Sequence, residues 1–105
     1  VDYKTPLVNL ITDTKTVPIK FELKQNFPNP FNQTTIIRYS LPEILHVTLI
    51  VYDVLGNKVA TLVDQTKKPG IYDVIFEAGN LSSGIYFYYI TAGKFSETKK
   101  LLLLK

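Results

Sequence analysis

Apolar and polar residues alternate with a period of two along short stretches that cover most of the chain from residue 19 onward. Such alternation is typical of β-strands with one buried and one solvated face. Three stretches show it most clearly, with apolar or β-branched faces formed by Thr35, Ile37, Tyr39 and Leu41, by Val47, Leu49 and Val51, and by Tyr72, Val74 and Phe76. The pattern predicts seven strands, over residues 19–23, 34–41, 46–53, 58–63, 71–78, 84–92 and 95–103.

The stretch 84–92 is apolar at almost every position, so its pattern does not fix which side is buried. One candidate inward face consists of Tyr86, Tyr88 and Ile90. The opposite face is equally apolar and consists of Ile85, Phe87 and Tyr89. From the alternation along the strands we expect one shared core that contains Tyr39, Leu49, Val74 and Tyr86.

Turn residues separate the expected strands. Gly56 and Gly93 lie between pairs of strands and can adopt the positive φ that hairpin turns with a bulge require. Seven short strands separated by such turns predict an all-β fold, an Ig-like or fibronectin-like antiparallel β-sandwich. We expect no regular helix longer than a turn or two.

A short internal repeat opens two of the aromatic strands, as Gly70-Ile71-Tyr72 and again as Gly84-Ile85-Tyr86. A duplicated module would repeat over a longer stretch. We therefore interpret the repeat as structural, with the glycine turning the chain and the tyrosine filling one end of the sandwich, as in a tyrosine corner.

The composition agrees with one folded domain. The chain has 105 residues, of which 46% are hydrophobic and 20% are charged, and this is too apolar for a disordered segment. Residues 1–18 are polar and rich in Thr, and we expect them to form a linker that can contribute one edge strand. The patterned domain is expected over residues 19–105. The first residues lack the start of a secretory signal peptide, so we expect any such signal to lie upstream in a longer chain.

The composition also disfavours several classes of partner. No stretch approaches the roughly 20 apolar residues that span a bilayer, so we expect no membrane insertion. The net charge of +3 is spread along the chain, whereas nucleic-acid-binding proteins cluster basic residues on one face. We therefore expect no nucleic acid partner. The sequence has no cysteine, which removes disulfides, thiolate zinc ligands and thiol nucleophiles.

No motif for catalysis occurs in the sequence. The single histidine, His46, stands at the start of an expected strand without a nucleophile motif, so we favour a solvated histidine at a strand end. The nine carboxylates are spread along the chain, and no calcium-loop or phosphate-loop motif is present. We expect a protein that is not an enzyme, with no catalytic or metal-binding residues and no cofactor.

The segment 25–32 combines two prolines with two phenylalanines and three asparagines. Pro28 and Pro30 favour an extended backbone with few donors. We expect the two aromatic side chains to enter the core as anchors, namely Phe27 and Phe31. We expect two of the amide side chains to satisfy nearby backbone groups, namely Asn29 and Asn32.

The last block of the sequence places four leucines between two lysines, in the order Lys100, Leu101, Leu102, Leu103, Leu104 and Lys105. Three interpretations are open for this block. It can be a strand buried on both faces, a strand whose outer leucines form an exposed edge that is prone to association, or a terminal tag that another protein recognises.

Seven blocks, read in order, resemble one known family: residues 25–32, 34–36, 51–56, 59–62, 69–72, 83–88 and 100–105. Together they closely resemble the type A C-terminal sorting domain of the type IX secretion system, over about residues 21–105. Its structural motif is represented here by Asn29, Pro30, Phe31, Asn32, Gly56, Gly70, Tyr72, Gly84 and Tyr86.

The resemblance implies an Ig-like β-sandwich that directs a larger cargo protein across the outer membrane. Its expected partners are the outer-membrane translocation machinery of type IX secretion, the associated signal peptidase and an N-terminal cargo domain in the same chain. The expected location is the periplasm in transit, and then the cell surface or the medium. Cleavage after export is expected in the linker, within residues 1 to about 20, and machinery recognition in the block 100–105.

Two alternatives belong to other classes. One is a fibronectin-like or carbohydrate-binding accessory module of a secreted enzyme, for which an exposed row of aromatics at 86–89 would be typical. Exposure of Phe87 and Tyr88 distinguishes it from a sorting domain. The other alternative is a hydrolase built around His46, which we disfavour because no partner motif accompanies that residue.

Overall fold

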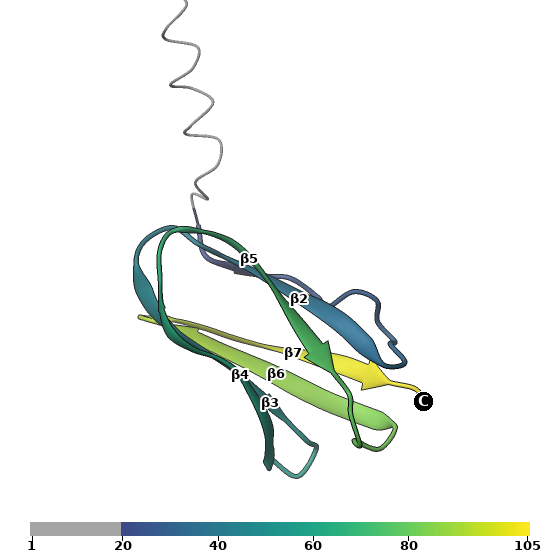
Figure 1. Ribbon diagram of the computed structural model, residues 1–105. Helices are drawn as coiled ribbons and strands as arrows, with labels where there is room; N and C mark the ends of the chain where they lie inside the picture. Colours follow the sequence, from purple (N-terminus) through teal and green to yellow (C-terminus); the bar gives the residue numbers. More distant parts are fainter. Residues whose placement is uncertain (1–19) are drawn as a thin grey trace, which may run out of the picture.

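Two antiparallel β-sheets pack face to face as a sandwich in the computed structural model, which describes residues 20–105 (Figure 1). The strands are β1 Glu22–Leu23, β2 Thr34–Leu41, β3 Leu45–Tyr52, β4 Lys58–Lys67, β5 Gly70–Glu77, β6 Gly84–Ala92 and β7 Phe95–Leu103. One sheet has the order β1-β2-β5 and the other the order β4-β3-β6-β7. The described residues contain no helix, so the prediction of an all-β sandwich is confirmed.

The expected strands are all present, and most of them differ from the expectation only at their ends. β2, β6 and β7 have the expected bounds, while β3 and β5 each begin and end one residue earlier than expected. β4 continues beyond the expected end at residue 63, because the polar residues that follow are paired with β3 as far as Leu45 and Lys67. β1 is shorter than expected, and residue 19 and the expected linker 1–18 lie outside the described residues.

The core lies between the two sheets and consists of the inward positions of alternating strands. Among the buried residues are Ile37, Tyr39 and Leu41 on β2, Val47, Leu49 and Val51 on β3, and Tyr86, Tyr88 and Ile90 on β6. The facing of β6 is thereby settled, with its odd-numbered residues turned outward. The expected common core is confirmed, since Val74 packs against a cluster that contains Tyr39, Leu49 and Tyr86. Burial of each of the aliphatic side chains stabilises the folded state by about 1.5 to 3 kcal/mol relative to leaving it exposed.

The internal repeat forms two tyrosine corners. The Tyr72 hydroxyl donates to the carbonyl oxygen of Lys68 at 2.6 Å, and the Tyr86 hydroxyl donates to that of Ser82 at 2.7 Å. In both cases the acceptor lies four residues upstream. Gly70 and Gly84 have φ values of 156° and 150°, which residues with a side chain rarely adopt. The structural interpretation of the repeat is therefore confirmed.

The connection between β3 and β4 is a tight turn around Asp53. Gly56 has a φ of 88°, as expected, and donates to the Asp53 carbonyl oxygen at 3.0 Å. The Asp53 carboxylate accepts hydrogen bonds from the backbone N–H groups of Asn57 and Leu55, both at 2.9 Å. These bonds, the one from Asn57 foremost, lower the pKa of Asp53. The aspartate therefore fixes the turn.

Candidate functional site

The block 100–105, called the terminal block below, comprises the second half of β7, the edge strand of the four-stranded sheet, and the two residues that follow the strand. Leu101 and Leu103 are fully buried, whereas Leu102 is half-buried and Leu104 is 51% exposed. Lys100 and Lys105 are exposed. Of the three interpretations of this block, a strand buried on both faces is wrong, because only alternate leucines enter the core. The outer leucines remain available to a partner.

A loop covers the free edge of this strand, and we call residues 25–31 the edge loop. The Gln25 side chain donates to the Lys100 carbonyl oxygen at 2.7 Å, and Asn29 Oδ1 accepts from the Leu102 N–H at 2.9 Å. The Phe31 backbone donates to Leu102 of the strand at 3.0 Å and accepts from Leu104, just beyond the strand, at 2.9 Å. The loop thus pairs backbone groups that an edge strand otherwise leaves open to association.

The last residue of the block is also held by the fold. The Lys105 N–H donates to Ser83 Oγ at 2.9 Å, and the Lys105 ammonium donates to the Gly79 carbonyl oxygen at 2.7 Å. Both acceptors lie in the segment between β5 and β6. The block therefore has contacts on either side, with the edge loop and with this segment, and it is a folded element of the domain.

A buried polar network holds the edge loop against the core. The Asn26 side chain donates to Thr35 Oγ1 at 3.0 Å and to the Pro28 carbonyl oxygen at 3.1 Å. Thr35 Oγ1 donates to the same Pro28 oxygen at 2.8 Å. Asn26 is buried, although the pattern of the sequence singled out its neighbours and not this residue. An asparagine in a proline-rich segment gives no signal of burial, because its burial depends on how the loop packs against Thr35 of β2 and Tyr88 of β6.

The two phenylalanines of the edge loop face opposite ways. Phe31 is buried as predicted, with its ring centroid 6.0 Å from that of Phe76. The prediction that Phe27 enters the core is wrong, since its side chain is 78% exposed. Its backbone exchanges two hydrogen bonds of 3.0 Å with Ile36, an outward residue of β2, and this pairing directs Phe27 to the same outer side. Asn29 bonds a backbone group as predicted, although that of distant Leu102, whereas Asn32 is exposed and its side chain bonds no backbone group within residues 20–105, so the prediction for Asn32 is wrong.

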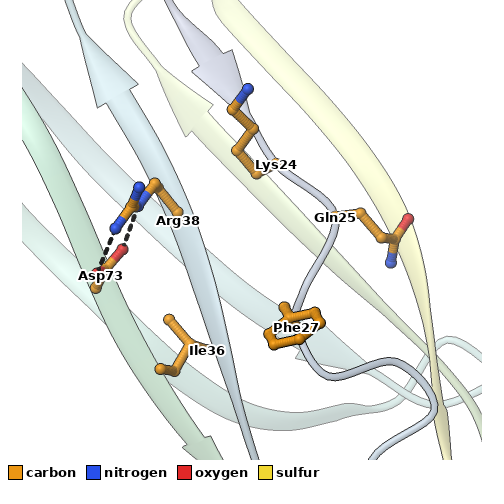
Figure 2. Close-up of a pocket in the computed structure, with 6 residues that line it drawn as sticks. All are labelled: Lys24, Gln25, Phe27, Ile36, Arg38 and Asp73. Carbon is orange, nitrogen blue, oxygen red and sulfur yellow. Dashed lines mark hydrogen bonds and ion pairs between the residues drawn. The ribbon is translucent and has the colours of Figure 1, made fainter.

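A hollow of about 340 Å³ lies beside Phe27 on the outer face of the three-stranded sheet (Figure 2). Its floor carries a two-bond ion pair in which Arg38 donates to Asp73 at 2.7 and 3.0 Å. The pair raises the pKa of Arg38 and lowers the pKa of Asp73. Because both pKa values move further from neutral pH, neither group is poised for acid–base chemistry. The remaining lining residues are Lys24, Gln25, Phe27 and Ile36.

A second hollow, of about 270 Å³, lies where the edge loop meets the terminal block. It is lined by Gln25, Asn29, Ile85, Lys100, Leu101 and Leu102. Its lining combines the outward residues Ile85, Lys100 and Leu102 and the buried Leu101 with the two side chains that cap the strand edge. A partner that contacts Lys100 and Leu102 therefore also meets the edge loop.

Comparison with known families identifies the domain. The family model described as the secretion system C-terminal sorting domain matches residues 25–104. The chain belongs to this family. No curated protein matches the sequence closely enough to count as a relative. The matched segment begins at the first residue of the edge loop and ends within the terminal block. It therefore includes both of these mutually bonded segments.

As a sorting domain of type IX secretion, the protein is exported to the cell surface or the extracellular space. The family is defined as a sorting signal and has no catalytic activity in its description. The residues that the sequence predicts to form its structural motif are distributed over the framework of this structure. Asn29, Pro30, Phe31 and Asn32 lie in or next to the edge loop, Gly56 lies in the turn after β3, and the pairs Gly70 with Tyr72 and Gly84 with Tyr86 build the two corners.

The alternatives to a sorting domain find no support at the positions that test them. Tyr86 and Tyr88 are buried, whereas Phe87 and Tyr89 face outward and are only partly exposed, so residues 86–89 do not form the continuous exposed row of aromatics that the accessory-module alternative requires. His46 is exposed on the sheet surface and bonded to Asp64 at 2.8 Å. Within residues 20–105 no cluster of three potential metal ligands occurs, and no helix there could cross a membrane.

Proposed function

We propose that the sorting domain is recognised in its folded form through the outward side chains of the block 100–105. It directs an N-terminal cargo across the outer membrane through the type IX translocation machinery, from the periplasm to the cell surface or the medium. The observation that carries this proposal is the alternation of the block, in which Leu101 and Leu103 hold the fold while Lys100, Leu102 and Leu104 face outward. A partner can therefore bind the outward side chains of the block while the domain stays folded.

The fold separates recognition from stability in a way that an experiment can use. The edge loop binds β7 through backbone groups of the strand, so replacing the outward side chains of the strand preserves these bonds. Replacing Leu103, which is fully buried, removes core packing and costs about 2 to 5 kcal/mol. Variants on the two faces of one strand thus test two different roles.

The test fuses the 105-residue chain behind a Sec signal and a fluorescent cargo in a host with type IX secretion. We expect wild-type export, and periplasmic retention of a folded Leu102→Ser/Leu104→Ser variant. Leu103→Ala is the matched control, and its loss of stability is measured by urea unfolding alongside export. Normal export of the outward double variant would refute recognition through the block. Equal export of the cargo with and without the 105 residues would refute the sorting role itself.

We also propose that a signal peptidase of the secretion system removes the domain after export, within residues 1 to about 20. The family match begins only at residue 25, which leaves the preceding segment free of the sorting motif. Mass spectrometry of the exported cargo checks this proposal. We expect a cargo that ends within these residues, and exported cargo that still carries residues 20–105 would contradict it.

A further inference from the structure

The outer face of the four-stranded sheet is apolar where a solvated sheet face is normally polar. On β6 the outward side chains are Ile85, Phe87 and Tyr89, each half-buried or exposed. An antiparallel sheet that packs on one side only usually places polar residues on the other. Packing of the core does not account for these three apolar outward residues, because β6 contributes its inward residues Tyr86, Tyr88 and Ile90 to the core.

Neighbouring strands extend this apolar area. On β3, Ile50 lies opposite Tyr89 and Tyr52 lies opposite Phe87. On β7, Leu102 lies opposite Ile85. Side chains directly opposite each other on one face of an antiparallel pair have Cβ atoms about 4.5 to 5.5 Å apart, so they form one continuous surface. We call this surface the outer aromatic face, and it consists of Ile50, Tyr52, Ile85, Phe87, Tyr89 and Leu102.

Two lysines flank the outer aromatic face. Lys58 on β4 lies opposite Tyr52, and Lys100 on β7 lies opposite Phe87. One row across all four strands therefore runs from Lys58 through Tyr52 and Phe87 to Lys100. The standard spacing between neighbouring strands places the backbones of the two lysines about 14 Å from each other. Neither lysine forms an ion pair with an acid in the part of the chain that the structure describes. The margins of the face are positive and uncompensated.

The opposite side of the sandwich lacks this combination. Its outer face also exposes apolar residues, among them Ile36 and Ile75, which lie opposite each other on β2 and β5. The adjacent cross-strand pair is Arg38 with Asp73, whose charges cancel. A negatively charged partner surface would therefore bind the outer face of the four-stranded sheet in preference to that of the three-stranded sheet.

We propose that the outer aromatic face is a docking surface for the export machinery, whose matching surface is apolar and carries carboxylates that oppose Lys58 and Lys100. The inference rests on the proposed function, because Lys100 and Leu102 belong both to the terminal block and to this face. Continuity between the two surfaces means that the machinery contacts the sheet as well as its last strand. Buried aromatic anchors inside a charged rim are typical of such interfaces.

The test uses positions outside the terminal block, in the cargo fusion described above. We expect Lys58→Glu and the double variant Tyr52→Thr/Phe87→Thr to lower surface cargo by about tenfold or more, as loss of interface anchors does. Lys94→Glu, in the turn between β6 and β7, is the matched control for charge. Ile75→Thr, on the opposite sheet, is the matched control for lost apolar area. Urea unfolding of each purified chain reports whether the variants fold.

Competition provides a second measurement. Excess cargo-free wild-type chain in the periplasm should reduce export of the fused cargo, whereas the folded Lys58→Glu chain should compete about tenfold less well. Normal competition by that variant would overturn the inference.

The outcomes separate this inference from the proposed function. Failure of the wild-type fusion to be exported refutes the proposed function. Retention of only the Leu102→Ser/Leu104→Ser variant, with normal export of the Lys58 and Tyr52/Phe87 variants, leaves the proposed function standing and overturns the docking face. Equal losses for the Lys94 and Ile75 controls also overturn it. So does normal translocation of the face variants followed by release from the surface, which would indicate a surface ligand instead.

Discussion

Two fully buried tyrosines, Tyr39 and Tyr88, differ in what their hydroxyl groups contact. The Tyr88 hydroxyl donates to the Lys24 carbonyl oxygen at 2.7 Å and accepts from the Asn26 N–H at 2.8 Å, so it joins the edge loop to the core. The Tyr39 ring stacks on Tyr72 with centroids 5.3 Å apart, but its buried hydroxyl has no hydrogen-bond partner within residues 20–105. The same chemical group is therefore paired at one position and unpaired at the other.

Removing each hydroxyl tests this difference. Tyr88→Phe leaves a buried N–H and carbonyl without their partner, and we expect the free energy of unfolding to fall by about 1 to 3 kcal/mol. Tyr39→Phe removes an unpaired polar atom, so we expect no loss and a gain of up to about 1 kcal/mol. Urea unfolding measures both variants under the same conditions. Equal losses at the two positions would contradict the assigned contacts.

At the scale of elements, the edge loop and β7 depend on each other. The loop contributes side-chain and backbone partners to β7, while the strand fixes the loop through Leu102 and Leu104. Edge strands without such cover are sites of unwanted pairing between chains. The edge loop therefore keeps the terminal block in one defined strand while its outward side chains remain available.

Asn29 provides a test of this coupling. Asn29→Ala removes the acceptor of the Leu102 N–H, so we expect faster amide hydrogen exchange at Leu102. Asn29→Asp retains an oxygen acceptor at the same place and should keep the protection. Hydrogen exchange followed by NMR reports the two variants residue by residue. Unchanged protection in Asn29→Ala would mean that the loop does not depend on this bond.

At the scale of the whole molecule, stability should depend on pH in the alkaline range. Burial raises the pKa of both Tyr39 and Tyr88 to about 12, from an ordinary value of 10.0. As the pH passes 10, the unfolded chain loses these protons while the folded domain keeps them. Because the folded state then binds more protons, the free energy of unfolding decreases with rising pH between about 10 and 12.

This pH dependence is measured by urea unfolding at intervals from pH 8 to pH 12. Tyr39→Phe is the control, since it removes one of the two buried phenols and should reduce the slope above pH 10. Below pH 10 the folded and unfolded states both keep their phenolic protons. The plots of unfolding free energy against pH should therefore run parallel there for the wild type and the variant. A wild-type slope that does not exceed that of Tyr39→Phe would contradict the burial of the Tyr39 phenol.

Several features of the site could not be read from the pattern of residues. Phe27 and Phe31 are identical in type and differ only in which backbone they pair with, Ile36 or the end of β7. The outward direction of Phe87 was equally hidden, because both faces of β6 are apolar. Such choices depend on partners far away in the chain, which the local sequence does not name.

The sequence by itself determined the number of strands, the inward faces of β2 and β3 and the turns, because alternation and turn chemistry are local properties. It also indicated the family, because the seven motif blocks are strings of neighbouring residues. The tertiary structure alone decided that the terminal block is a capped strand and that Asn26 is buried. It also decided that Lys58, Tyr52, Phe87 and Lys100 share one row. These features arise from pairing between segments as much as 75 residues apart, such as Gln25 with Lys100, and long-range register is set by packing of the whole sandwich.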